Sequence, residues 1–212
     1  MDALVKPAFK STIEEIDRLD WDSLDRKALT RIAWAYYYFS IQFRENLEAA
    51  TWLYPDDEKL AHLKSEECDT ANLSPWPGVA KPGERMNHDE FMRRLLDLDA
   101  LDADARRALQ GLGEAYLMDV RPYDIAAKAM SIASYEDGGL ETVFRAILRA
   151  RAWNSPLLQA FRHFLTEHIR FDSDPDQGHG ALSRHIEPDD RILPFWRKFH
   201  QLLVAAAPQL AG

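Results

Sequence analysis

Apolar side chains recur at helical spacing along most of this chain. Between about Leu24 and Tyr54, apolar or small residues return every three to four positions, which is the period of one face of an α-helix. Pro55 and the two aspartates after it predict the end of this helix and the start of a second helix, which runs to about Ala71. Alternating β-branched runs between turn residues, the pattern typical of strands, do not occur. The pattern therefore favours an all-α protein.

More helical segments follow in the second half of the chain. They are predicted from His88 to about Leu98, Asp102 to Asp119, Pro122 to about Arg151, Ser155 to Phe171, and about Pro188 to Ala207. A loop rich in proline and glycine at 72–87 interrupts the series. Such loops are often lids or binding loops, although plain surface insertions are at least as common. The short connections elsewhere predict an up-and-down helical bundle that forms a single domain over residues 1–212.

Composition and charge exclude several classes of protein. A chain of 212 residues with 46% hydrophobic composition can bury one sizeable core. Its net charge of −9 argues against nucleic-acid binding, which needs a basic surface. The single cysteine, Cys68, excludes an internal disulfide and a multi-cysteine zinc site. Because no apolar signal core and no membrane-spanning run is seen, we expect a cytoplasmic protein with no membrane partner.

Carboxylates and imidazoles fall on the apolar faces of the predicted helices. Burying such a group is costly unless it is paired or binds a metal. His168 and Asp172 lie one helical turn apart, so that they can hold one ion between them. The residues on these faces are Glu67, His88, Glu136, His168, Asp172 and His179. Bundle cores that hold two iron or manganese ions use this mixture of ligands, drawn from several helices.

Ordinary structural roles are the alternative for each of these residues. A single histidine on an apolar face is more often a core residue than a ligand. Glu67 or Glu136, taken alone, is more often half-exposed, or paired with an arginine such as Arg145 or Arg149. The coincidence of six such residues is what favours a metal site.

The aspartates at 172, 174 and 176 alternate like the opening of an EF-hand calcium loop. Such a loop needs glycine at its sixth position and a bidentate glutamate at its twelfth. Counted from Asp172, these positions hold Gln177 and Ser183. The calcium interpretation therefore fails, and Asp174 and Asp176 are interpreted as solvated loop residues.

Short motifs carry a resemblance to a known enzyme family. From about Trp34 to His185 the chain resembles the haem-oxygenase-like diiron oxidases and oxygenases, which are non-haem enzymes. Two spacings are longer than in the family: the one from the first motif to the second, and the one from the fourth to the fifth. The motifs are Glu66-Glu67-Cys68-Asp69, Asn87-His88-Asp89-Glu90-Phe91, SYEDGG at 134–139, HIRFD at 168–172 and GHG at 178–180.

The resemblance implies an all-α, single-domain helical bundle of the haem-oxygenase-like type, with about seven core helices. It implies an oxidase or oxygenase that binds two Fe ions, or iron and manganese, and no haem. Its partners would be dioxygen and a small-molecule substrate. By position in the motifs, the metal ligands would be Glu67, His88, Glu136, His168, Asp172 and His179. Catalytic residues other than these ligands stay unassigned.

Aromatic residues on the first long helix have two interpretations. Tyr36, Tyr37, Phe39 and Phe43 line a substrate cavity in one, and are simply core residues in the other. The substrate itself cannot be identified from these residues.

Proteins of the same fold also carry other activities, each of which needs particular residues. Haem oxygenases need an axial histidine near the N-terminus, but the first histidine here is His62. Thiaminase-type members need a late cysteine, but the only one is Cys68. A cofactor-independent quinone-precursor oxidase would show a cationic pocket, and a metal-free scaffold or binding protein would pair each buried carboxylate with arginine. Both of these stay open, as does a homodimer.

Overall fold

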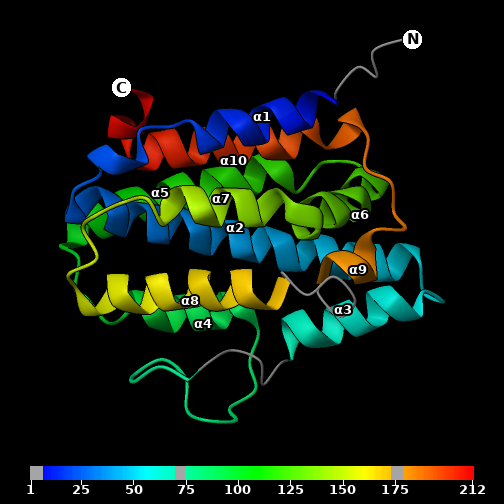
Figure 1. Cartoon of the computed structure of the whole chain (residues 1–212), viewed down its shortest axis with the longest axis horizontal. Helices are drawn as coiled ribbons and strands as arrows, with labels where there is room; N and C mark the ends of the chain where they lie inside the picture. The colour runs from blue at the N-terminus through cyan, green and yellow to red at the C-terminus, as the bar shows by residue number, and fades with distance from the viewer. Residues whose placement is uncertain (1–6, 70–74, 173–178) are drawn as a thin grey trace.

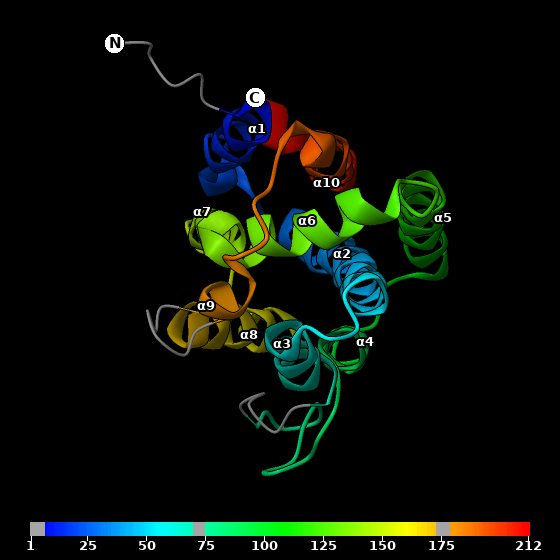
Figure 2. The same ribbon diagram turned by 90° about the vertical axis from the view of Figure 1, so that its right-hand side faces the viewer.

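The long helix α2 (Arg26–Leu53) runs through the middle of the molecule (Figure 2). The computed structural model describes residues 7–69, 75–172 and 179–212. Asp25 caps the start of α2, because its side chain accepts a hydrogen bond from the Ala28 amide at 2.7 Å. The helix is as long as the periodicity predicts, and most of its residues are buried. It therefore serves as the axis against which most of the other helices in the described part of the chain pack.

The other helices form layers on either side of α2 (Figure 1). On one side lie α1 (Ala8–Asp17) and α10 (Leu193–Ala206), which contact each other. On the opposite side lie α3 (Glu58–Cys68), α4 (His88–Leu96) and α8 (Pro156–Asp172). Each of these last three contacts α2. Helix α1 is an addition to the helices predicted from the sequence.

An interruption in the helical backbone shows that one predicted helix is wrong. The continuous helix expected from Pro122 to Arg151 is wrong, because α6 (Ile125–Ser134) and α7 (Leu140–Ile147) are separated by a π-helical turn, η2 (Tyr135–Gly139). Within that turn Gly138 has a φ of 87°, a conformation that favours glycine. A Cβ on Gly139 would lie 2.1 Å from the carbonyl oxygen of Ser134. The two glycines therefore permit the break.

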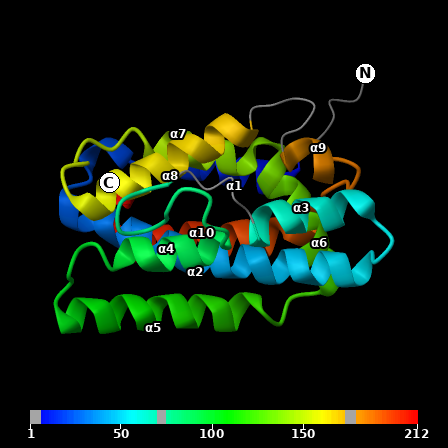
Figure 3. The ribbon, with the colours of Figure 1, turned by 90° about the horizontal axis from the view of Figure 1, so that it is seen from below.

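The remaining elements are short, apart from α5. Helix α5 (Ala103–Val120) lies at the edge of the bundle, beside α2 (Figure 3). A five-residue helix, α9 (His179–Ser183), contacts α3 and η2. The last long helix begins at Leu193 rather than at Pro188, because a 3₁₀ turn precedes it. The 3₁₀ turns are η1 (Trp21–Ser23), η3 (Asp190–Ile192) and η4 (Pro208–Ala211).

The fold is an all-α, single-domain helical bundle around one hydrophobic core. Over the described residues no strand is found, and Trp76 and Ala80 form an isolated bridge. Tyr36, Phe39 and Phe43 of α2 are buried in the core cluster, as the core interpretation of these aromatics expects, whereas Tyr37 is only partly buried against it. In the same part of the chain, no helix combines the length and the apolar character needed to cross a membrane.

Candidate metal centre

Five of the six predicted ligands come together between α3, α4, α8, α9 and η2. Glu67 lies in the last turn of α3, and His88 is the first residue of α4. The others described are Glu136 in η2, His168 near the end of α8, and His179 at the start of α9. The sixth, Asp172, is the last residue of α8, but its side chain lies outside the described part of the chain. Its role as a ligand stays a prediction, and Asp174 and Asp176 also lie outside the described residues.

A first group consists of Glu67, His88 and His168. The Oε2 atom of Glu67 lies 2.6 Å from Nδ1 of His88. That same nitrogen lies 3.1 Å from Nε2 of His168. One potential ligand atom from each residue therefore lies within 4.8 Å of the other two.

Hydrogen bonding orients the ring of His168 toward this group. Nδ1 of His168 lies 3.1 Å from the carbonyl oxygen of Phe164, one helical turn earlier. Since a carbonyl only accepts hydrogen bonds, Nδ1 must carry the proton. In the neutral ring the lone pair is then on Nε2, which faces His88. Metal-binding histidines commonly use their second nitrogen in this way.

A second group consists of Glu67, Glu136 and His179. Nδ1 of His179 lies 2.8 Å from Oε1 of Glu67 and 3.4 Å from Oε2 of Glu136. Both carboxylate side chains are only 4% exposed. Two buried carboxylates this close together require positive charge nearby, because burial and mutual repulsion both disfavour ionisation.

Glu67 joins the two groups, because each of its carboxylate oxygens faces a different one. Burial alone would raise the pKa of Glu67, but the charges of His88 and His179 outweigh burial and hold the pKa well below its usual range. Among the described residues, the ion pairs of Glu67 are with imidazoles and not with lysine or arginine. The arginine partner expected of a metal-free scaffold is therefore not found at Glu67.

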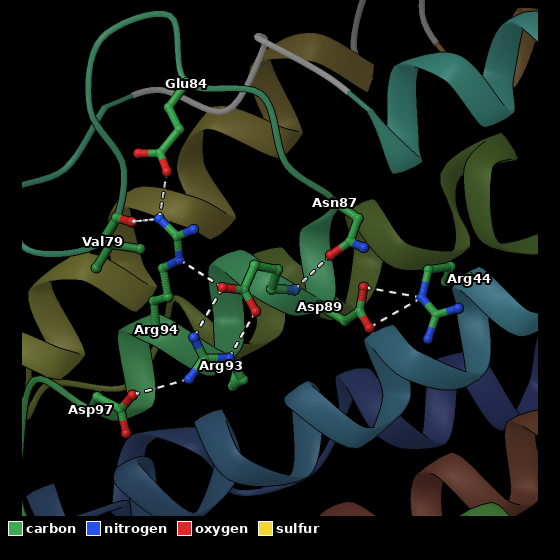
Figure 4. Close-up of polar contacts among 9 residues, drawn as sticks. Arg44, Val79, Glu84, Asn87, Asp89, Arg93, Arg94 and Asp97 are labelled. Atoms are coloured by element: carbon green, nitrogen blue, oxygen red, sulfur yellow. Dashed lines mark hydrogen bonds and ion pairs between the residues drawn. The ribbon is translucent and has the colours of Figure 1, made fainter.

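Local contacts fix His88 at the start of α4. The Asn87 side chain accepts a hydrogen bond from the Glu90 amide at 2.8 Å and so caps the helix. Asp89 receives two hydrogen bonds from Nε of Arg44, at 3.1 and 3.2 Å, which tie this turn to α2 (Figure 4). The position of His88 is thus set by a helix cap and by an ion pair to the central helix.

The break at η2 and the close packing of α9 bring Glu136 and His179 together. A Cβ on Gly180 would lie 3.0 Å from the carbonyl oxygen of Glu136, so the backbones approach closely there. Arg184 follows α9 and donates a hydrogen bond from Nε to Asp137 at 3.1 Å. The sequence motifs contain Glu136, His179 and Gly180. The helical periodicity, however, does not predict the contact between the two segments.

An aromatic wall borders the first group. The rings of His168 and Phe164 have centroids 4.1 Å apart, and Phe144 lies 5.8 Å from the same imidazole. Phe164 also meets His88 edge to face at 5.9 Å. Both phenylalanines are buried, at 2% exposure or less. An apolar wall of this kind excludes water and strengthens electrostatic interactions inside the site.

The alternative partners named from the sequence lie elsewhere. Arg145 pairs with Glu141 at 2.6 Å, and Arg149 pairs with Asp17 at 2.7 Å. Cys68 is outside both groups, and burial together with the charge of Glu67 raises the pKa of its thiol to about 12. The thiol is therefore protonated at neutral pH, which does not fit a cysteine nucleophile.

The remaining histidines, at positions 62, 163, 185 and 200, also lie outside the two groups. His62 is exposed on α3, whereas His163 packs against Trp76 with tilted rings and His185 pairs with Asp57. Substitutions of these histidines can therefore serve as controls for substitutions of the predicted ligands.

The spacing within each group fits a metal ion. With metal–ligand bonds of about 2.1 Å, two ligand atoms at a right angle lie about 3 Å apart. The contacts measured here run from 2.6 to 3.4 Å. In addition, Oε1 of Glu67 is fully buried, and among the described residues it has the ion pair with His179 but no hydrogen bond of good geometry. A buried carboxylate oxygen of this kind is suited to a cation, and a mixture of carboxylate and imidazole suits a transition-metal ion.

Comparison with known proteins adds no relative. The chain matches no protein-family profile, no characterised protein and no solved structure. The resemblance to the haem-oxygenase-like diiron enzymes therefore rests on the short motifs and stays a prediction.

Proposed function

We propose that this chain is a non-haem dinuclear metal enzyme, an oxidase or oxygenase that uses dioxygen on a small organic substrate. The observation that carries the proposal is the placement of Glu67, whose two carboxylate oxygens face two separate ligand groups. A shared carboxylate of this kind is suited to bridging two cations. Bound iron, or iron with manganese, would supply the electrons and the open coordination positions that dioxygen chemistry needs.

The chain's own residues have distinct tasks in this proposal. Glu67 neutralises charge in both groups, while the hydrogen bond to the Phe164 carbonyl keeps the Nε2 lone pair of His168 directed into the site. Phe144 and Phe164 exclude water on the side of the first group. Glu136 and His179 supply the second group from η2 and α9.

The two other candidate functions receive less support from the described residues. A cofactor-independent quinone-precursor oxidase needs a cationic pocket, whereas this cluster holds two buried carboxylates. A metal-free scaffold predicts arginine beside each carboxylate, whereas the described ion pairs of Glu67 are with histidine.

Metal content and oxygen consumption test the proposal together. Protein produced with added iron should contain about two transition-metal ions per chain and should consume dioxygen in its Fe(II) form. His168→Ala should lose about one ion. His62→Ala removes an exposed imidazole from α3 and should lose none. Less than about half an equivalent in the wild type, with no further loss in His168→Ala, would contradict the proposal.

A further inference from the structure

The described part of the proline-rich loop, residues 75–87, is packed against the bundle. Its backbone turns back at Gly78, so that the Trp76 amide donates a hydrogen bond to the Ala80 carbonyl at 3.0 Å. Val79, Ala80 and Met86 are each at most 7% exposed and belong to the hydrophobic core. Figures 1 and 3 show this segment running along α4 and α8. A plain surface insertion would not need such anchoring.

Arg94 fastens the segment to α4 (Figure 4). One nitrogen, Nη1, donates to the Val79 carbonyl at 3.2 Å and to Oε1 of Glu84 at 2.7 Å. Its Nε donates to Oε1 of Glu90 at 2.7 Å, on the same helix. The guanidinium side chain is one third exposed, so these charge-assisted bonds are only partly weakened by solvent.

Two further contacts reach the neighbouring helices. The ring of Trp76 packs against the ring of His163 of α8 in a tilted arrangement, with centroids 4.9 Å apart. At the other end, Nη2 of Arg85 donates to the carbonyl oxygen of Asp69 at 2.6 Å. Asp69 caps the end of α3, two residues after Glu67. The Arg85 contact is exposed and contributes little stability, so Arg94 and Trp76 are the main attachments.

The three helices that the segment contacts carry the three residues of the first ligand group: α3 carries Glu67, α4 carries His88 and α8 carries His168. We propose that segment 75–87 is a positioning element that holds α4 and α8 together, with a weak further contact at the end of α3, and thereby sets the metal affinity of the first group. The second group is completed by residues of η2 and α9 and lacks this attachment in the described contacts. The inference rests on the proposed function, because it assumes that metal binds there.

Neighbouring arginines on α4 provide a matched test. Arg94→Gln removes the donors to the segment, whereas Arg93→Gln removes bonds that stay on α4 and its cap, to Glu90 and Asp97. In a Co(II) titration we expect Arg94→Gln to weaken one of the two sites about tenfold, as is typical of outer positioning groups. Arg93→Gln should leave both sites unchanged, and Arg94→Lys should restore part of the affinity. Equal Co(II) affinities in Arg94→Gln and Arg93→Gln would overturn the inference. So would an equal loss of Co(II) affinity at both sites in Arg94→Gln.

A second measurement needs no metal. In the metal-free protein, hydrogen exchange of the Phe91 and Met92 amides in the first turns of α4 should be faster in Arg94→Gln than in Arg93→Gln. Equal exchange in the two variants would overturn the positioning role. If the wild type takes up no Co(II), the proposed function fails, and the exchange comparison still decides whether the segment holds α4 in place.

Discussion

Replacing Glu67 tests whether one carboxylate serves both ligand groups. Glu67→Gln keeps the size of this buried side chain but removes its charge and one of its two oxygens. Because each oxygen faces a different group, the substitution should weaken metal binding in both. His168→Ala is the comparison, since it removes a residue of the first group alone.

The expected size of the effect follows from binding linkage. A metal ion at a free concentration of 100 times its dissociation constant stabilises a folded protein by about 2.7 kcal/mol. Two bound ions therefore contribute about 5 kcal/mol. For a chain of this length, 1 kcal/mol corresponds to about 2–4 °C in Tm. Adding Co(II) should therefore raise the Tm of the wild type by about 10–20 °C and that of His168→Ala by about half as much. For Glu67→Gln we expect a rise of less than about 3 °C.

Differential scanning calorimetry with and without Co(II) measures these shifts. Each variant is compared with its own metal-free form, because Glu67→Gln also removes the ion pairs to His88 and His179 and so changes the starting stability. A full shift in Glu67→Gln would refute the shared-ligand geometry. So would equal losses in Glu67→Gln and His168→Ala, since the first should affect two ions and the second only one.

Three further changes test other parts of the structure. Tyr116→Phe removes the hydroxyl that donates to Gln42 Oε1 at 2.7 Å in the core; it should cost about 1–2 kcal/mol in urea unfolding, and an unchanged midpoint would contradict this. Gly180→Ala places a Cβ 3.0 Å from the carbonyl oxygen of Glu136, so one of the two backbones must give way slightly. The Co(II) affinity of one site should therefore fall. An unchanged affinity would argue against close packing between α9 and η2. Burial alone would raise the pKa of Asp57, but hydrogen bonds from α3 amides and a neighbouring imidazole lower it. The stability contributed by Asp57 is therefore present above its unfolded pKa and is lost as the pH falls through its folded pKa. Below about pH 4 the wild type should thus lose more stability than Asp57→Asn. Unfolding midpoints measured over a range of acid pH test this.

Helical periodicity locates a buried polar residue when the helix is regular. In α3, Leu60, Leu63 and Glu67 share one face, and all three are buried as that face predicts. In α8, Phe161 and Leu165 are likewise fully buried on the face that leads to His168. These positions could be read from the sequence because 3.6 residues per turn places them over one another without reference to any other segment.

Glu136 shows how a correct position can follow from an incorrect helix. The apolar stripe predicted it to face inward along one continuous helix, and the residue is indeed only 7% exposed. The helix is nevertheless broken one residue later, where Asp137 and Gly138 leave helical φ and ψ values. The glycine pair signals a possible break, but the direction that the chain takes after it depends on packing against α9 and α10.

The placement of His179 depends on tertiary contacts rather than on local sequence. A five-residue helix is too short to form through helix propensity alone, so α9 must be held by its neighbours α3 and η2. Gly180 allows that approach because a side chain there would press on the Glu136 carbonyl. The first ligand group, by contrast, is built from residues of three longer helices, α3, α4 and α8. The two halves of the candidate centre are therefore assembled by different means: the ligands of the first group lie on helices whose periodicity places them, whereas the contact between Glu136 and His179 depends on tertiary packing.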